Sequence, residues 1–487
     1  MSIAQKAFSA LKWATVAKLV VQITSWAGTL VVVRLLSPED YGLMAKVAVV
    51  CSISAAIAEL GLGAAIVRST EVSRDDLRRL SGASLLFGFA VTAAVVAASP
   101  LLALLFREPR LVWPIAFASL QILIASAALV PSAMATRDLG FKLLATTEMA
   151  AGFVGIVLTL ALAFWGAGVW ALVLGTLGGA LTRTVGLLAF GERTRPTLRL
   201  RGIGEHLKFG LTLVGNRVSY FIVVQADVVI GSAFLTTTEI GQYSVALQLA
   251  TLPMSKVMGT INQITMPVVA RQQHDLPAVR ESVLRSLAVV ATFAFPVLWG
   301  ISALAPEIVA FLFGDRWLAA VMPLQILPLI VPVRMISSIL FTTSLALGNR
   351  QLDLRNSIAN FVLIPLGFFV GSHWGILGLC LSWLVALPLT YGVSLPGVVR
   401  AIGLPWPRLL SEVGLPALAT AAGYGAVTLA RPAFAALPSL AALLVLSLAG
   451  GAVFMAVMAV LSRRHLAATR DFVRAVAGRA PAEGAAP

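Results

Sequence analysis

Charge is scarce in this sequence of 487 residues. Only 12% of the residues are Asp, Glu, Lys or Arg, whereas soluble domains usually carry about 25%. Hydrophobic residues make up 59% of the chain and gather in long uncharged runs such as 80–106, 111–136 and 149–182. This composition excludes an ordinary soluble enzyme and predicts membrane-spanning helices of about 20 residues each.

Residues for catalysis and metal binding are also few. The two cysteines, Cys51 and Cys380, lie inside apolar runs and are interpreted as small hydrophobic residues of helices. The four histidines fall between predicted helices or at a helix end, and the sequence contains no HExxH, CxxC, Walker lysine or GxSxG pattern. We therefore expect a transporter rather than an enzyme, with no cofactor and no metal ion.

The predicted fold is an all-α polytopic membrane protein of about fourteen transmembrane helices. The expected spans are 13–33, 41–63, 81–106, 113–136, 145–165, 168–190, 209–234, 243–266, 285–312, 319–347, 356–372, 375–395, 413–430 and 438–461. Pro323, Pro328 and Pro332 predict that the helix over 319–347 is kinked or broken.

Basic residues alternate between the connecting segments. Of the 36 lysines and arginines, six fall inside predicted helices. Five lie in one alternating set of connecting segments, and all others lie in the other set, which includes both termini. The five are Arg34, Arg107, Arg110, Arg316 and Arg431. Because cytoplasmic loops are enriched in Lys and Arg, we expect both termini to be cytoplasmic. The net charge of +15 then reflects topology rather than nucleic-acid binding.

Two halves of the chain share short patterns in the same order. Gly42 corresponds to Gly241 at an offset of 199, Phe106 to Phe313 at 207, and Arg137 to Arg350 at 213. We expect two pseudo-symmetric six-helix bundles plus two C-terminal helices, with the substrate path between the bundles. The predicted parts are 1–190, a basic cytoplasmic linker 191–208, 209–395, two helices over 396–465 and a cytoplasmic tail 466–487.

Charged side chains in the middle of the spans are the candidate site. A charge at a helix centre costs about 2.5–3.5 kcal/mol on insertion scales, so such charges face protein or water. The six cations outnumber the three acids Glu59, Glu148 and Asp227, which predicts an anionic substrate. Arg183 and Glu148 are interpreted as residues near helix ends, and Lys18 and Lys46 could also extend to the interface. The candidate cavity residues, including polar neighbours at helical spacing, are Lys18, Gln22, Lys46, Asn216, Arg217, Lys256 and Arg334.

Asp227 and Glu59 are the candidates for proton coupling. Asp227 could instead neutralise a neighbouring cation, and Glu59 could cap the inner end of its helix.

Several segments resemble a known family. RLLSPEDYGLMA over 34–45, ELGLGAAIVR over 59–68, FREP over 106–109 and FGDRWLAAVMPLQILPL over 313–329 are similar to the polysaccharide transporter (Wzx-type) flippases. These belong to the multidrug/oligosaccharidyl-lipid/polysaccharide exporter superfamily. The resemblance extends from about residue 5 to about residue 395.

The resemblance implies a flippase of the bacterial inner membrane. It would move undecaprenyl-diphosphate-linked oligosaccharide repeat units to the periplasmic leaflet for exopolysaccharide, capsule or O-antigen assembly, alongside a polymerase and chain-length machinery. The implied fold is two six-helix bundles arranged as a V, with Lys18, Arg217, Lys256 and Arg334 matching the family's cavity cations in kind. The alternatives are a multidrug exporter of organic cations and a lipid II-type flippase. A cation exporter is disfavoured because the cations in the spans outnumber the acids.

Overall fold

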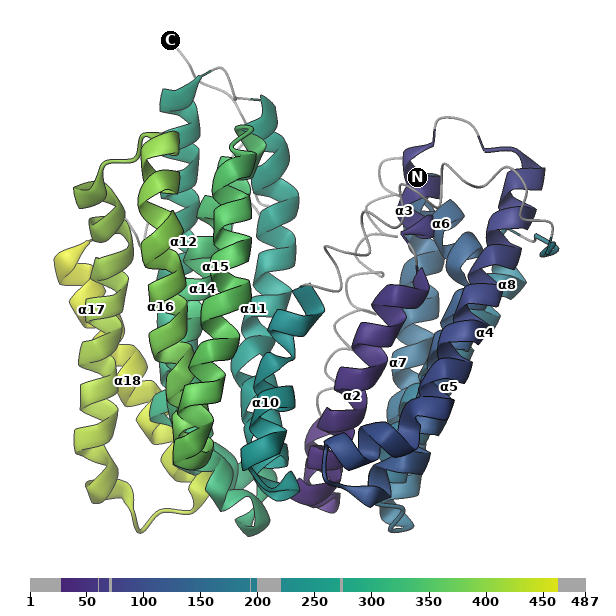
Figure 1. The fold of residues 1–487 in the computed structure, drawn as a ribbon. Coiled ribbons are helices and arrows are strands. Elements are labelled where there is room, and N and C mark those ends of the chain that lie inside the picture. The colour runs from purple at the N-terminus through teal and green to yellow at the C-terminus, as the bar shows by residue number, and fades with distance from the viewer. Residues whose placement is uncertain are drawn as a thin grey trace, which may run out of the picture. The chain divides into compact units, whose positions relative to one another are not determined.

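A computed structural model gives the structure of the chain (Figure 1). It describes residues 28–59, 61–69, 72–192, 194–198, 220–271 and 275–462, with the side chains of 255–271 excepted. Within these residues every regular element is a helix. The chain divides into two compact units between Gly241 and Gln242, and we call the described residues before and after this point unit 1 and unit 2.

Unit 1 contains the helices up to the first turn of α11. Residues 28–35 and 220–224 are also helical. The named elements are α2 (Pro38–Glu59), α3 (Leu62–Arg68), α4 (Arg74–Leu105), η1 (Pro109–Leu111), α5 (Val112–Ala127), α6 (Leu129–Arg137), α7 (Phe141–Phe164), α8 (Val169–Phe190), α10 (Ala226–Phe234) and the start of α11 (Thr237–Arg271). Helices α4, α5, α8 and α7 pack side by side in this order (Figure 1).

Unit 2 contains the rest of α11 and the remaining helices. These are α12 (Leu276–Ala303), α13 (Ala305–Ile308), η2 (Val309–Phe313), η3 (Asp315–Ala320), α14 (Val321–Ala346), α15 (Arg350–Gly371), η4 (Ser372–Trp374), α16 (Gly375–Ile402), α17 (Trp406–Ala430), η5 (Arg431–Phe434) and α18 (Ser439–Leu461). The main core is formed by α12, α14 and α16, against which α17 packs. An ion pair of 2.8 Å between Arg431 Nε and Glu307 Oε1 joins η5 to α13.

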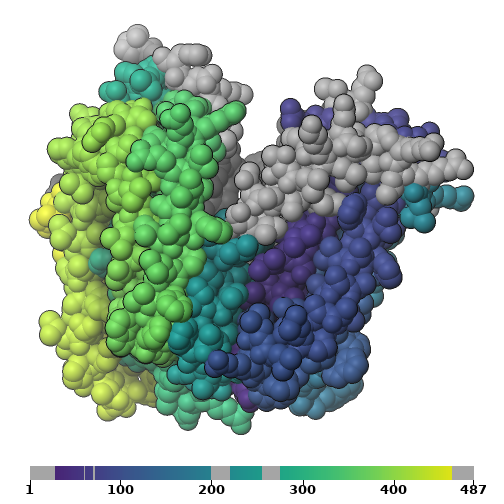
Figure 2. Space-filling view, in the orientation of Figure 1, coloured from purple at the N-terminus to yellow at the C-terminus, as the bar shows by residue number. Residues whose placement is uncertain are grey.

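The outer faces of the helices are apolar. In unit 2, α15 and α16 form the face turned to the viewer in Figure 2, and the exposed side chains of α15 include Ile358, Phe361, Val362 and Leu366. Exposed side chains of this kind suit a lipid environment and not water. Ten helical runs in the described residues are long and apolar enough to cross a membrane, one of them extending over both α15 and α16. The chain is therefore a multi-pass membrane protein.

The expected count of fourteen spans is not confirmed. The predicted span 13–33 lies largely outside the described residues, and 209–234 is described only from residue 220 onward. The ten runs do not include α11. The predicted linker 191–208 and tail 466–487 also fall mostly or wholly outside them.

Helix α14 runs without interruption through its prolines, so of the predicted kink or break the break is wrong. Pro328 and Pro332 lie inside it and remove two backbone donors. The neighbouring carbonyls of Gln325 and Leu329 accept hydrogen bonds from Ser302 and Trp299 of α12. These side-chain donors support the carbonyls of the proline-containing turns.

The backbone repeats between the two halves of the chain. Three pairs of residues adopt left-handed or other positive-φ conformations at matching positions, at offsets of 207, 209 and 207 residues. They are Arg107 and Gly314, Leu139 and Gly348, and Gly168 and Gly375. The pairing of Arg137 with Arg350 is out of register, because Arg137 ends α6 whereas Arg350 begins α15.

The first turns of α2 and α11, both within unit 1, approach each other reciprocally. A Cβ at Gly42 would overlap the carbonyl oxygen of Thr237, and a Cβ at Gly241 would overlap that of Pro38. Pro38 and Thr237 are themselves 199 residues apart and begin the two helices. Only glycine permits this distance between the backbones.

We predict that Gly42→Ala lowers the free energy of unfolding by roughly 1–3 kcal/mol, because the added methyl group forces the two backbones apart. Gly152→Ala is the matched control, since nothing lies within 4 Å of a Cβ added at this position of α7. That change should be neutral or stabilising because alanine favours a helix. Thermal unfolding of the purified variants checks this, and equal melting temperatures for both would contradict the reciprocal contact.

Candidate functional site

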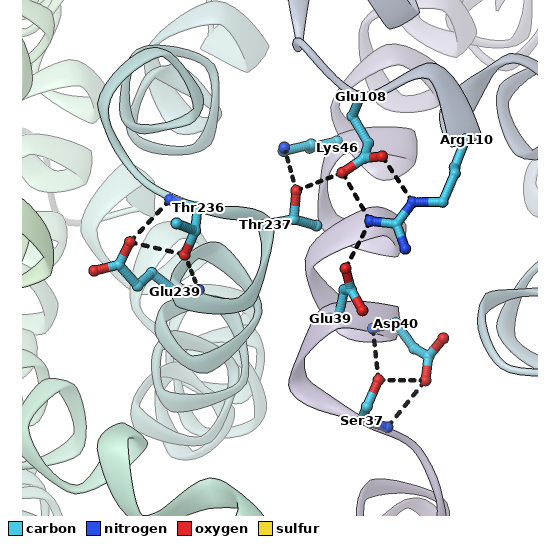
Figure 3. Close-up of polar contacts among 9 residues, drawn as sticks. All are labelled: Ser37, Glu39, Asp40, Lys46, Glu108, Arg110, Thr236, Thr237 and Glu239. Carbon is cyan, nitrogen blue, oxygen red and sulfur yellow. Dashed lines mark hydrogen bonds and ion pairs between the residues drawn. The ribbon is translucent and has the colours of Figure 1, made fainter.

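A polar network in unit 1 surrounds the start of α11 (Figure 3). Lys46 Nζ on α2 donates to Thr237 Oγ1 at 2.9 Å, and Thr237 Oγ1 donates to Glu108 Oε2 at 2.9 Å. Arg110 contacts both Glu108 oxygens, at 2.8 and 3.0 Å, and reaches Glu39 Oε1 at 2.6 Å. We call these five residues the Lys46 network.

The Lys46 network gives the buried ammonium of Lys46 a partner. Lys46 is only 2% exposed, and burying a charge is tolerated when it is hydrogen-bonded and near an opposite charge. The guanidinium of Arg110, together with Thr237 and Lys46, lowers the pKa of Glu108, whose segment lies outside the helices. The sequence does not predict this network, because FREP and Gly241 belong to patterns that lie more than 100 residues apart.

Both helix starts beside this network carry the same capping arrangement (Figure 3). Asp40 accepts hydrogen bonds from the amide and hydroxyl of Ser37, and Glu239 accepts the same pair from Thr236. These are capping boxes, in which an acid three residues on closes the first turn. The repeated motif therefore has a structural purpose, which is to begin α2 and α11 in the same way.

Asp227 is buried in the first turn of α10. It is 1% exposed, and its Oδ1 accepts a hydrogen bond of 2.7 Å from the amide of Val228. The preceding Gln225 donates through Nε2 to Ser52 Oγ of α2 at 3.0 Å. Asp227 is thus a carboxyl group held next to the contact between α10 and α2.

Glu59 lies at the end of α2, beside a pocket of about 540 Å³ within unit 1. The chain breaks helical geometry just after it, where Gly61 adopts a φ of 61°. The pocket is lined by residues of α2, α3, α5 and α6 and by Arg183 of α8. Arg183 Nε pairs with Glu148 Oε2 of α7 at 2.9 Å, so the positive charge at this pocket already has a carboxylate partner.

Arg334 in unit 2 has a different environment. It lies in the middle of α14 and is partly exposed. Its Cζ lies 4.8 Å from the centre of the Trp383 ring of α16, which is cation–π geometry. Among the residues that the structure describes, no carboxylate pairs with Arg334.

The other predicted cavity residues are outside the described part of the chain. Lys18, Gln22, Asn216 and Arg217 fall in undescribed segments, and only the backbone of Lys256, in α11, is described. Their roles therefore stay predictions.

We predict that Glu108→Gln lowers the free energy of unfolding at neutral pH by about 1 kcal/mol, because it removes the charge between Arg110 and Lys46. Folding lowers the pKa of Glu108, so the stabilisation is complete above the ordinary carboxyl pKa and is lost as the pH falls through the lowered value. The difference between wild type and variant should shrink in acid.

Melting temperatures measured from neutral to acid pH test this expectation. Asp75→Asn is the control, since the pair of Asp75 with Arg78 is 3.7 Å long and its side chains are 72% and 50% exposed. A Glu108→Gln difference that is absent at neutral pH, or constant with pH, would contradict the stabilising role of the network.

Comparison with known proteins places this fold in a family. Residues 31–322 match the family model described as "Polysaccharide biosynthesis protein". The lipopolysaccharide biosynthesis protein WzxC of Escherichia coli (strain K12) is 25% identical over 390 residues, covering 79% of each chain. The succinoglycan biosynthesis transport protein ExoT of Rhizobium meliloti (strain 1021) is 25% identical over 288 residues, covering 59% of this chain and 58% of its own.

Solved structures agree on the fold. The lipid II flippase MurJ in an inward closed conformation superimposes with a TM-score of 0.72 and 15% identity, covering 93% of this chain and 99% of that one. An inward-facing multidrug resistance MATE family transporter of the MOP superfamily gives 0.61 and 16% identity, covering 80% and 99%. The prediction of a transporter rather than an enzyme agrees with these relatives. The chain therefore belongs to the polysaccharide biosynthesis protein family, and it is a multi-pass membrane protein whose fold resembles those of MurJ and the MATE transporter.

Proposed function

We propose that this chain is a flippase for oligosaccharide repeat units linked to undecaprenyl diphosphate. It moves them from the cytoplasmic to the periplasmic leaflet of the bacterial inner membrane, for exopolysaccharide, capsule or O-antigen assembly. Transport proceeds by alternating access through a cationic central cavity, with both termini in the cytoplasm. A polysaccharide polymerase and its chain-length machinery are the expected partners downstream.

The observation that carries this proposal is the environment of Arg334, which contains an aromatic ring and no paired carboxylate among the described residues. The residue is partly exposed and lies mid-helix, and its guanidinium is supported by an aromatic ring. A cation in such a position is costly unless an anion or water reaches it. The diphosphate of a lipid carrier supplies the anion, and guanidinium binds phosphate oxygens through two parallel hydrogen bonds.

The physical task also suits a cationic path. A diphosphate and its sugars cannot cross hydrocarbon unaided, because burying charged and polar groups without partners is prohibitive. Lys18, Gln22, Lys46, Asn216, Arg217 and Lys256 are proposed to line the path with Arg334. In the described structure Lys46 is hydrogen-bonded to Thr237, so its part in transport would require that bond to open.

The relatives favour this substrate class over the alternatives. WzxC and ExoT are named for lipopolysaccharide and succinoglycan biosynthesis. We propose that the sugar units for such polymers are carried on a polyprenyl diphosphate. A multidrug resistance MATE family transporter has a similar fold, but a guanidinium without a carboxylate partner would repel an organic cation. A lipid II-type substrate would present a similar diphosphate to Arg334.

Proton coupling is proposed to involve Asp227, with Glu59 as the second candidate. Asp227 is 1% exposed and lies in the short helix α10. A buried carboxyl group in a membrane helix is a common site of reversible protonation.

We predict that Arg334→Ala reduces polymer export by about tenfold or more while the protein level stays normal, because the headgroup loses a charge-assisted contact. Arg217→Ala and Lys256→Ala should also weaken export. Arg183→Ala is the matched control, since Arg183 is a helix arginine already paired with Glu148. Full export by the three cavity variants, at wild-type protein levels, would refute the proposed charge pairing.

A second prediction concerns energy coupling. If Asp227 carries the proton, export should depend on the transmembrane pH gradient in the wild type and lose that dependence in Asp227→Asn. Export measured while the pH gradient is collapsed tests this. Export that never responds to the gradient would instead indicate that removal of the product outside drives transport.

A further inference from the structure

The support beneath Arg334 is an aromatic cluster rather than an acid. Trp383 of α16 is 5% exposed, and Phe368 of α15 packs edge-on against its ring, with centroids 5.0 Å apart and planes at 71°. The ring therefore has little freedom to tilt, and the guanidinium lies 4.8 Å from its centre.

A buried hydrogen bond fixes the orientation of the Trp383 ring. Its indole Nε1 donates to the hydroxyl of Tyr243 at 2.7 Å. Tyr243 lies on α11 within unit 2 and is fully buried. A buried indole N–H needs a partner, so this bond sets the rotation of the ring within its plane and joins α11 to α16.

A second aromatic residue borders the same charge. Tyr391, two turns beyond Trp383 on α16, lies near Ser337 of α14 and near the charge of Arg334. The ring of Tyr391 also lies 6.2 Å from that of Phe341. The surroundings of Arg334 are thus aromatic and hydroxyl groups, with no neutralising acid among the described residues.

The kind of support decides how much charge is left for a ligand. Arg110 and Arg183 are held by carboxylates, which cancel most of their field. An aromatic face attracts a guanidinium through its quadrupole and carries no net charge. Because the ring holds the guanidinium through its π face and not through an acceptor atom, the five N–H donors of Arg334 are not committed to a carboxylate.

We propose, on the basis of the proposed function, that Trp383 and Tyr243 are positioning residues for the diphosphate contact. Trp383 holds the guanidinium fork of Arg334 in place without neutralising its charge, and the Tyr243 hydroxyl holds Trp383. The fork then presents two parallel donors to two oxygens of the diphosphate. Neither Trp383 nor Tyr243 touches the substrate in this arrangement.

Binding of undecaprenyl diphosphate and undecaprenyl monophosphate to the full-length protein in nanodiscs tests this proposal. The readout is the Kd for each lipid and the ratio of the two. A general loss of folding reduces the number of binding sites. Loss of a positioned guanidinium instead raises the Kd for the diphosphate lipid and so brings the two Kd values closer together. We expect Trp383→Phe and Tyr243→Phe to weaken diphosphate binding by roughly threefold to tenfold.

Two comparisons separate positioning from packing. If Tyr243 acts through Trp383, the double variant should bind no more weakly than Trp383→Phe alone. Trp299→Phe is the matched control, because Trp299 also packs edge-on against a phenylalanine, at 5.2 Å, and donates to the Leu329 carbonyl of α14 at 3.1 Å. That variant should leave the ratio unchanged.

Arg334→Ala distinguishes the two levels of the proposal. If Arg334→Ala binds the diphosphate like the wild type, the charge pairing in the proposed function is wrong. If Arg334→Ala loses binding while Trp383→Phe and Tyr243→Phe keep the wild-type ratio, or change it only as Trp299→Phe does, the positioning inference is overturned and the proposed function stands.

Discussion

The cost of holding a charged group away from water governs the polar architecture of this protein. Few charges occur in its apolar helices, and four described cations show how such charges are supported. Lys46 donates to a hydroxyl group within a network of acids and an arginine, whereas Arg183 and Arg431 pair with carboxylates. Arg334 alone among these four is held by an aromatic ring. Neutralising partners suit structural charges, and a neutral support suits a charge that serves a ligand.

The internal repeat preserves backbone geometry more closely than it preserves charge. The capping boxes at Ser37 and Thr236 are equivalent, as are the positive-φ residues that follow Phe106 and Phe313. Lys46, however, corresponds to Val245 at the same offset of 199. Duplicated helices thus provide a common frame, and individual substitutions give each half its own electrostatics.

Much of the fold could be predicted from the sequence, because spans of about 20 apolar residues have few alternatives to a helix. The partners of the charges could not, since spacing along one helix does not reveal which residue a neighbouring helix supplies. Trp383 and Tyr243 are 140 residues apart and meet only through packing. The predicted pairing of Arg137 with Arg350 was wrong for a related reason. Two basic residues five positions apart recur by chance, whereas a positive φ angle at a turn is fixed by backbone geometry.

The most direct test of the account is whether the Arg334 guanidinium touches the phosphates of a bound lipid carrier. Solid-state NMR can measure dipolar coupling between ³¹P of undecaprenyl diphosphate and ¹⁵N of labelled arginine side chains in the membrane-reconstituted protein. The account predicts a coupling that corresponds to a separation of about 4 Å, as in a charge-assisted hydrogen bond, and its loss in Arg334→Gln. Bound lipid whose phosphates couple to other arginines, with an unchanged signal in Arg334→Gln, would contradict it.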